Sequence, residues 1–152
     1  MSRTLALDVG ERRIGVAICD PEERTAVALT ILQRRDEPAD VAALKALIGK
    51  EEAGALVVGL PLSMDGSFGP QAQLVRAFAE RLAAELAMPL ELWDERLSTQ
   101  QVERRPVVRE RKGARSRRPP RPLPPSDDLA AAVILQSFLD SRRHGHSIIG
   151  RD

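Results

Sequence analysis

The order of predicted elements indicates an α/β domain built on a mixed five-stranded sheet with helices on both faces. The first part of the chain contains three strand-like segments with short connections, which predicts an antiparallel meander. The remainder alternates helix-like and strand-like segments, and such crossovers place the later strands parallel to the first. A chain of 152 residues has the length of one domain, so we expect residues 1–152 to share a single core.

The three first strands are separated by turn residues. Residues 3–9 are apolar apart from their ends and predict a buried strand that carries Asp8 near its end. Gly10 marks a tight turn into a second strand over residues 14–19, and a third candidate covers residues 25–32.

Helix and strand alternate in the middle of the chain. Apolar side chains at helical spacing predict a helix around residues 41–48, and the short apolar segment 55–60 predicts a strand. Pro70 suits the first turn of a second helix, whose apolar stripe runs to Leu86. A fifth strand is predicted at residues 90–93.

The last part of the chain contains a short helix, a basic segment and a final helix. Ser98 and Gln101 match a capping box, so we expect a short helix to begin at Ser98. Residues from about 104 to 125 are rich in proline and arginine without apolar periodicity, which predicts a flexible basic loop. The final helix is predicted from Asp127 to about Arg142.

The net charge of +1 hides an uneven distribution of charge along the chain. Residues 1–102 carry a balance of −5, residues 103–121 carry +7, and residues 122–152 carry −1. Twenty of the 23 cationic side chains are arginines, whose planar fork matches phosphate oxygens, although a high genomic G+C content would also favour arginine. The distribution predicts a body that gathers cations and a segment that binds phosphates.

Composition excludes several classes of protein. A single cysteine, Cys19, excludes a disulfide framework and a zinc site built on several thiolates. Four aromatic residues, none of them tyrosine, argue against a module that reads bases mainly by stacking. The longest apolar run, residues 129–135, is far too short to span a membrane, and no signal-peptide pattern precedes the first strand. We therefore expect a cytoplasmic protein without a membrane partner.

Acidic residues lie where ligands gather in α/β sheets. Asp8 and Glu95 end the first and fifth strands, and Asp127 and Asp128 open the final helix. Converging carboxylates suit Mg²⁺ or Mn²⁺ and in-line phosphoryl chemistry, with Asp8 bridging two ions and Glu95 and Asp127 each completing one site. From spacing alone, Asp8 could instead form a turn, Glu95 could be a solvated strand end, and the aspartate pair could cap the helix.

Four segments carry a resemblance to a known family. In order along the chain they are residues 6–17, 57–71, 94–99 and 127–136. With these segments the chain resembles the YqgF/RuvX family, the RuvC-like Holliday junction resolvases also described as pre-16S rRNA nucleases. The resemblance implies an RNase H-like fold and a metal-dependent nuclease. It also implies that Asp8, Glu95 and Asp127 are the catalytic and metal-binding residues, with Asp128 taking the third place if the register shifts by one residue.

The resemblance implies a hydrolase that cleaves phosphodiester bonds with two Mg²⁺ or Mn²⁺ ions, as an endonuclease or an exonuclease. Its leading substrate is the 5′ end of pre-16S rRNA. One alternative is a Holliday junction resolvase that acts on branched DNA and would need a homodimer. Another is a non-catalytic rRNA-binding assembly factor. The stretch from Asp8 to Gly10 also resembles the first phosphate loop of actin-like sugar kinases, but those enzymes need two lobes.

Basic side chains are candidate contacts to nucleic acid. Arg12 and Arg13 in the first hairpin turn can bind backbone phosphates, or they simply form a solvated turn. The basic loop adds a larger set of candidate phosphate contacts: Arg104, Arg105, Arg109, Arg111, Lys112, Arg115, Arg117 and Arg118. Affinity from such contacts falls steeply with salt and carries little sequence information.

The segment after the fourth strand contains glycines and small polar residues. Gly59, Gly66 and Gly69 would let the backbone approach a ligand, and amides near Pro70 could meet a phosphate. In the family context, we expect three polar side chains to lie near the cleft: Ser63, Asp65 and Ser67.

Overall fold

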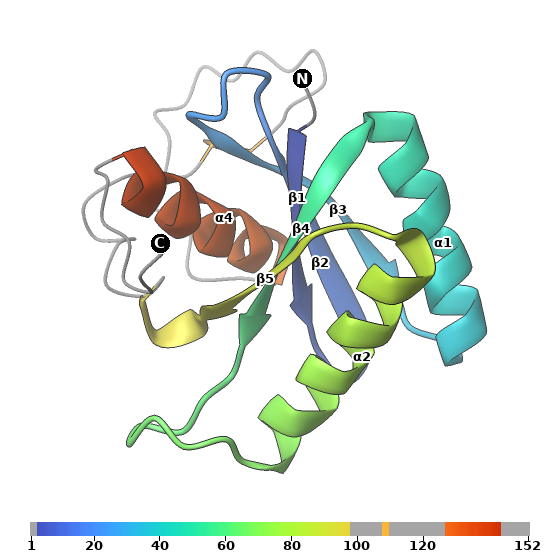
Figure 1. Cartoon of the computed structure of the whole chain (residues 1–152), viewed down its shortest axis with the longest axis vertical. Coiled ribbons are helices and arrows are strands. Elements are labelled where there is room, and N and C mark those ends of the chain that lie inside the picture. Colours follow the sequence, from blue (N-terminus) through green and yellow to red (C-terminus); the bar gives the residue numbers. More distant parts are fainter. Residues whose placement is uncertain (1–2, 98–107, 110–126, 144–152) are drawn as a thin grey trace, which may run out of the picture.

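The computed structural model describes residues 3–97, 108–109 and 127–143, drawn in colour in Figure 1. Three strands, a helix, a strand, a helix and a strand follow one another before the final helix. Apart from the two-residue strand β6, which lies between β5 and the final helix, this is the predicted order of elements. No helix of these residues is long and apolar enough to cross a membrane.

The strands form one mixed sheet in the order β5-β4-β1-β2-β3-β6. β1, β2 and β3 form the predicted antiparallel meander, while β4 runs parallel to β1 and β5 parallel to β4. Their bounds are β1 Arg3–Val9, β2 Arg13–Cys19, β3 Ala26–Gln33, β4 Ala53–Leu60, β5 Leu90–Asp94 and β6 Val108–Arg109.

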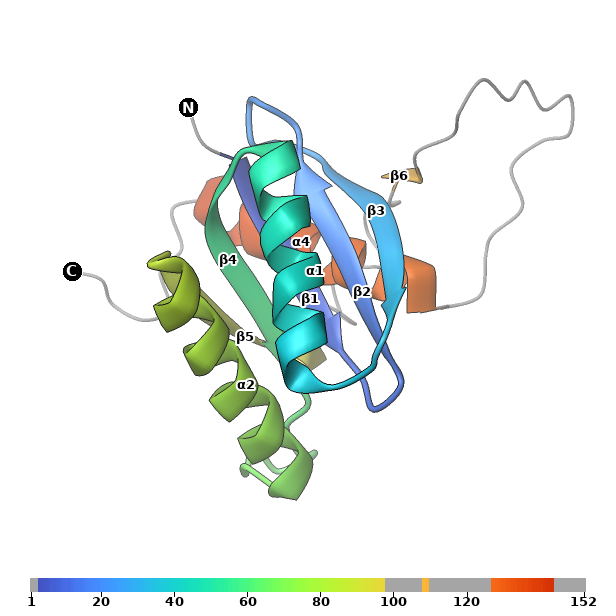
Figure 2. The same ribbon diagram turned by 90° about the vertical axis from the view of Figure 1, so that its right-hand side faces the viewer.

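Three long helices cover the two faces of this sheet. α1 (Glu37–Glu51) and α2 (Pro70–Leu86) lie side by side on one face, and α4 (Asp127–Arg143) lies on the other (Figure 2). Asp36 caps α1 by accepting a hydrogen bond from the Ala39 N–H at 2.8 Å. The expectation of helices on both faces is therefore confirmed.

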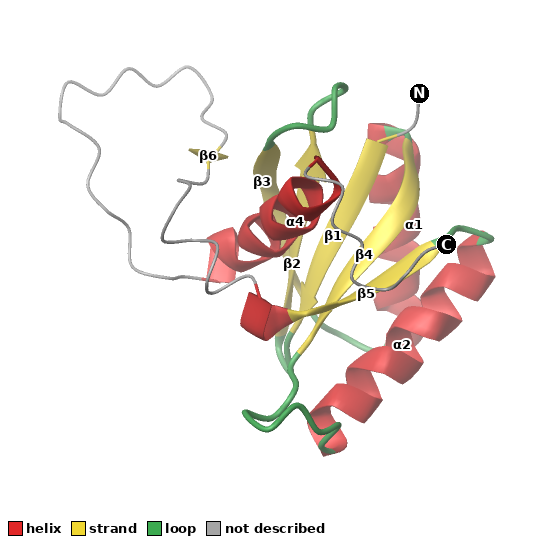
Figure 3. Ribbon diagram, turned by 60° about the vertical axis from the view of Figure 1, so that its left-hand side comes forward, coloured by secondary structure: helices red, strands yellow, loops and turns green. Residues whose placement is uncertain are grey.

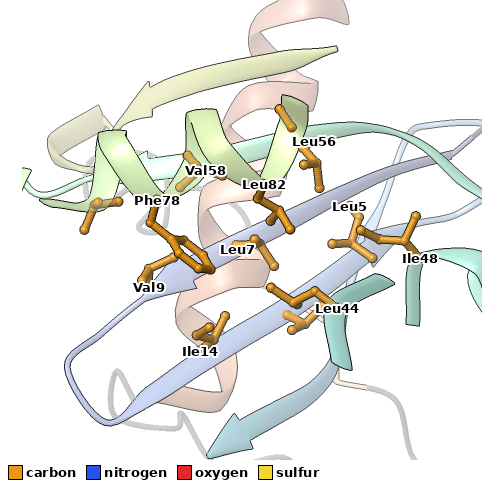
Figure 4. Close-up of a cluster of buried hydrophobic side chains, with 14 of the residues drawn as sticks. Leu5, Leu7, Val9, Ile14, Leu44, Ile48, Leu56, Val58, Phe78 and Leu82 are labelled. Atoms are coloured by element: carbon orange, nitrogen blue, oxygen red, sulfur yellow. The ribbon is translucent and has the colours of Figure 1, made fainter. Parts of the chain in front are cut away.

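Each face of the sheet has its own core, and strand alternation decides which residues enter which. Leu5, Leu7 and Val9 of β1 point into the core beneath α1 and α2 (Figure 4). Ala6, between them, belongs to the core beneath α4. The same alternation places Asp8 on the α4 face.

The predicted start of the short helix at Ser98 is wrong. Residues 95–97 are already helical, so Glu95 is the first residue of a helical turn rather than a strand end. Asp94 caps this turn, because its Oδ1 accepts a hydrogen bond from the Arg96 N–H at 2.9 Å. The residue that caps the turn, Asp94, thus lies four positions before Ser98, the predicted cap.

Part of the predicted basic loop forms a strand. Val108–Arg109 pairs in parallel with Val27 and Ala28 and adds a sixth, two-residue strand to the five that the sequence predicts. Residues 98–107 and 110–126 lie outside the described residues.

Candidate active site

Asp8 lies near the carboxyl end of β1 between two glycines. On one side it pairs with Gly15 of β2. On the other, the pairing of Leu7 with Val58 puts the next residue, Asp8, level with Gly59 of β4. Neighbouring strands lie about 4.8 Å apart, so bulky side chains at these two positions would crowd the Asp8 carboxylate. The two glycines therefore leave room beside Asp8 for other groups.

Glu95 reaches Asp8 from the turn after β5 by crossing β4 at Gly59. A Cβ atom on Gly59 would lie 2.9 Å from Glu95 Cγ, 3.0 Å from Glu95 Oε2 and 2.6 Å from Ile134 Cδ1. The Glu95 side chain thus occupies the space that the glycine leaves free. The sequence indicated that Gly59 would admit a ligand to the backbone, but what the structure places against Gly59 is the Glu95 side chain.

Asp8 and Glu95 form a proton-sharing carboxyl pair. Burial is the largest cause that raises the pKa of Glu95 from 4.5 to about 8, followed by the negative charge of Asp8. A side-chain hydrogen bond to Asp8 and the charge of Asp94 raise the pKa of Glu95 further. Two half-buried carboxyls in contact repel each other when both are ionised, so we expect the pair to keep one proton at neutral pH in the absence of a cation.

The donor set of this pair suits a hard divalent cation. Carboxylate oxygens are the ligands that Mg²⁺ and Mn²⁺ prefer, and a cation would compensate the charge that a shared proton now neutralises. Within the described residues no group of three His, Cys, Asp or Glu side chains gathers as a metal site. The structure therefore brings together two of the three predicted carboxylates, and of Asp127 it describes the backbone alone.

α4 packs against the face of the sheet that carries the carboxyl pair. Ile134 packs beside Gly59 and Glu95, while Gln136 contacts Arg24 and Ala26 near the start of β3, at the opposite end of the sheet. Arg142, near the end of α4, contacts Glu23 of the turn between β2 and β3 at 3.7 Å, so the helix ends at the end of the sheet opposite Asp8. Asp127 begins α4 seven residues before Ile134, about 10 Å along the helix axis.

Arg12 and Arg13 lie exposed in and after the hairpin turn that follows Asp8. This turn is held by Arg34, whose N–H donates to the Arg12 carbonyl at 2.8 Å and whose Nη1 donates to the Gly10 carbonyl at 2.8 Å. Arg34 also pairs with the buried Asp40 at 3.2 Å. The sequence analysis missed Arg34, because nothing in the local pattern distinguishes it from a solvated arginine.

Within the basic loop, the structure describes the backbone of β6 alone. The predicted contact of the Arg109 side chain with nucleic acid therefore stays a prediction. The other candidates of this loop lie outside the described residues: Arg104, Arg105, Arg111, Lys112, Arg115, Arg117 and Arg118. Their contacts to nucleic acid remain predictions.

The loop 61–69 forms a closed turn of its own. The Asp65 carboxylate accepts hydrogen bonds from the Ser67 N–H at 3.0 Å and the Ser67 hydroxyl at 2.7 Å, and these bonds lower the pKa of Asp65. Gly66 has φ +88°, a conformation that favours glycine. Figure 3 shows this loop, in green, at the same end of the sheet as the helical turn after β5.

Comparison with known proteins gives consistent matches over the chain. The profile of a family described as RuvX, Holliday junction resolvase, matches residues 2–141. A protein of Moorella thermoacetica called "Putative pre-16S rRNA nuclease" is 47% identical, over 91% of this chain and 94% of its own. A protein of the same name from Anaeromyxobacter dehalogenans is 48% identical, over 92% of this chain and 98% of its own.

Solved structures with the same architecture have little sequence in common with the chain. The RuvC structure of Thermus thermophilus matches with a TM-score of 0.60 at 14% identity, over 95% of this chain and 97% of that one. The large terminase nuclease of the thermophilic phage G20c matches with a TM-score of 0.54 at 15% identity, over 90% of this chain and 81% of that one. These likenesses establish the RNase H-like fold.

Proposed function

The chain belongs to the RuvX family of nucleases, and from this premise we propose that it hydrolyses phosphodiester bonds with divalent cations held by Asp8, Glu95 and Asp127. The observation that carries the proposal is the Asp8–Glu95 pair. One carboxyl comes from β1 and the other from the helical turn after β5, the Glu95 side chain lies against Gly59, and the pKa of Glu95 is raised to about 8.

Each residue has a separate role in this proposal. Asp8, flanked by Gly15 and Gly59, is the ligand most open to two ions, whereas Glu95 is held from the β5 side and Asp127 would approach from α4. Bound cations would activate the attacking water and stabilise the leaving oxygen. Glu95 keeps its proton until a cation arrives, so loading of the site should release a proton.

Arg12 and Arg13 would bind the phosphates that flank the cleaved bond. They follow Asp8 by four and five positions, and Arg34 fixes the turn that carries them. The basic segment 103–121, with its balance of +7, would bind the strand more loosely. Such contacts fix the position of the backbone but do not read sequence.

We favour a ribosomal RNA precursor as substrate, cleaved at the 5′ end of pre-16S rRNA, because the relatives of about 47% identity carry that name. This role would place the protein in the cytoplasm. The family description favours branched DNA as the alternative, and a resolvase that cuts two strands would need two copies of the chain.

A cleavage assay distinguishes these substrates. Labelled pre-16S rRNA, a four-way DNA junction and the corresponding single strands are incubated with Mg²⁺ or Mn²⁺ and the wild-type protein or Glu95→Gln. We expect metal-dependent cleavage of the precursor that Glu95→Gln abolishes. Cleavage of the junction alone would favour the resolvase, and binding of the precursor without cleavage would favour the assembly factor.

A further inference from the structure

The guanidinium of Arg96 is engaged by acceptors of the protein itself. Its Nε donates to both carboxylate oxygens of Asp94 at 3.1 Å, and its Nη2 donates to Asp94 Oδ2 at 2.7 Å. Its Nη1 donates to the Met64 carbonyl at 2.9 Å and approaches the Ser63 carbonyl at 3.5 Å. One side chain thus connects the end of β5 with the loop 61–69.

The loop is shaped around this guanidinium. A Cβ atom on Gly66 would lie 3.5 Å from Arg96 Nη2, so the turn of the loop packs closely against the arginine. The loop carries its own bonds, from the Gly66 N–H to the Ser63 carbonyl at 2.7 Å and from the Ser63 N–H to the Ser67 carbonyl at 3.1 Å. Arg96 supplies the contact between this closed turn and β5.

Arg96 directly follows Glu95 in the same helical turn. Its own backbone N–H is capped by Asp94, the residue that its guanidinium also holds. The turn, the carboxylate and the loop therefore form one unit, and a shift of this unit would move Glu95 relative to Gly59 and Asp8. A displacement of about 1 Å at a reacting group costs on the order of a hundredfold in rate.

We propose that Arg96 is a positioning residue that fixes the loop 61–69 to the turn carrying Glu95, and that it does not bind the substrate phosphate. An arginine beside a nuclease carboxylate would ordinarily be expected to bind the substrate phosphate. Here, however, a phosphate would have to displace a three-bond contact with Asp94 and the bond to the Met64 carbonyl. The consequence for catalysis rests on the proposed function, whereas the consequence for the loop does not.

The test uses Arg96→Lys and Arg96→Gln in the full chain. Lysine keeps the charge but cannot reproduce the planar two-point contact. The matched control is Arg81→Lys, since Arg81 makes the same two-point contact with Glu37, at 2.7 and 2.8 Å, between α2 and α1. Amide hydrogen exchange of residues 61–69 and single-turnover cleavage over a range of salt concentrations are measured for each protein.

We expect both Arg96 variants to raise exchange in residues 61–69 and to lower the maximal cleavage rate by about tenfold to a hundredfold. The half-saturating substrate concentration and the salt dependence of binding should stay at wild-type values, and Arg81→Lys should change nothing. Unchanged exchange in the loop would overturn the proposal. The proposal would also be overturned if the slope of log affinity against log salt concentration fell by the amount that one phosphate contact contributes, since that is the result of losing a phosphate ligand.

The two arms separate this inference from the proposed function. If the wild-type protein cleaves none of the substrates, the proposed nuclease activity fails, while the exchange measurement still decides whether Arg96 holds the loop. If the wild type cleaves and the Arg96 variants cleave equally well, the nuclease stands and the positioning role is refuted.

Discussion

The pKa of Glu95 is raised into the neutral range because the fold holds its side chain in a half-buried position beside the negative charge of Asp8. Glu95 begins a helical turn, crosses β4 at Gly59 and meets the carboxyl of Asp8. Two neighbouring carboxyls of this kind lower the stability of the metal-free protein near neutral pH. Binding of a cation would offset this cost, because the positive charge would stabilise the ionised form of both carboxyls.

The pKa of Glu95 sets a pH dependence of stability for the metal-free protein. Because its pKa is raised from 4.5 to about 8, the folded state holds a proton that the unfolded state releases between these values. The contribution of Glu95 to stability is therefore most favourable below about pH 4.5 and falls as the pH rises toward 8. We predict that Glu95→Gln removes this fall.

Thermal unfolding in EDTA at several pH values checks this prediction. At pH 8 the Glu95→Gln melting temperature should exceed that of the wild type, by about 2–4 °C for each kcal/mol of relieved cost. Addition of Mg²⁺ should reverse the order, because the wild type gains the binding free energy and the variant loses a ligand. A wild-type profile as flat as that of the variant would contradict the raised pKa.

Gly59 is the residue on which the pair depends sterically. Gly59→Ala would place a Cβ atom 2.6 Å from Ile134 Cδ1 and 2.9 Å from Glu95 Cγ. Both neighbours are side chains and can move, so we predict a stability loss of about 1–3 kcal/mol. Displacement of Glu95 should reduce cleavage by at least tenfold, on the order of the loss expected for a misplaced catalytic group.

Gly49→Ala is the matched control for that substitution. Gly49 lies in α1 and has nothing within 4 Å of the position its Cβ would take. Alanine there should stabilise the helix by about 0.5–1 kcal/mol and leave cleavage unchanged. Equal losses of cleavage in both variants, measured beside urea unfolding, would show that Gly59 has no special place.

At the scale of elements, α4 is held on the sheet by polar side chains in its middle. Gln136 Oε1 accepts from the Ala26 N–H at 2.9 Å, and Gln136 Nε2 donates to the Arg24 carbonyl at 2.9 Å and to Asp140 Oδ1 at 3.1 Å. Ser137 Oγ accepts from Trp93 Nε1 at 3.1 Å. These contacts fix the register of the helix and hence the height at which Asp127 begins it.

Gln136→Leu removes the contacts to β3 and leaves the buried Ala26 N–H without its acceptor. An unsatisfied buried donor costs about 1–3 kcal/mol, so we predict a loss of this size in the free energy of urea unfolding. Gln73→Leu, on the exposed side of α2, serves as control and should stay within about 0.5 kcal/mol of wild type. Equal stability of the two variants would contradict the anchoring role of Gln136.

The sequence predicts elements well where periodicity and local capping agree. The meander, the two crossovers and the final helix all follow from such patterns, and the alternation along β1 places Asp8 on one face. The helical turn after β5 could not be predicted, because nothing in the local sequence pattern marked Asp94 as the residue that caps it. The role of Gly59 could not be predicted either. It depends on a contact with Glu95, which is distant in sequence and lies in the turn after the neighbouring strand, β5.

At the scale of the whole molecule, charge is divided between an acidic body and a basic segment. Residues 1–102 carry −5 and residues 103–121 carry +7. The carboxyl pair lies in the acidic part, which favours cations over phosphates at the site itself. The basic segment, most of it outside the described residues, is where we expect the substrate backbone to be attracted.

Replacing Arg115, Arg117 and Arg118 with glutamine tests this division. Each arginine that contacts a phosphate contributes about 0.7–0.9 to the slope of log affinity against log salt. We predict a lower slope and weaker binding at low salt, with metal-dependent cleavage retained at saturating protein. A slope identical to that of the wild type in a filter-binding series would exclude these residues from the interface.

The most direct test of the central claim is single-turnover cleavage of a labelled pre-16S rRNA as a function of Mg²⁺ concentration, with Asp8→Asn, Glu95→Gln and Asp127→Asn compared with the wild type. We predict no cleavage in EDTA, saturable activation of the wild type by Mg²⁺, and a loss of at least about a hundredfold in each variant. Asp128→Asn should retain cleavage. Wild-type cleavage that persists in EDTA, or that survives Glu95→Gln undiminished, would contradict this prediction.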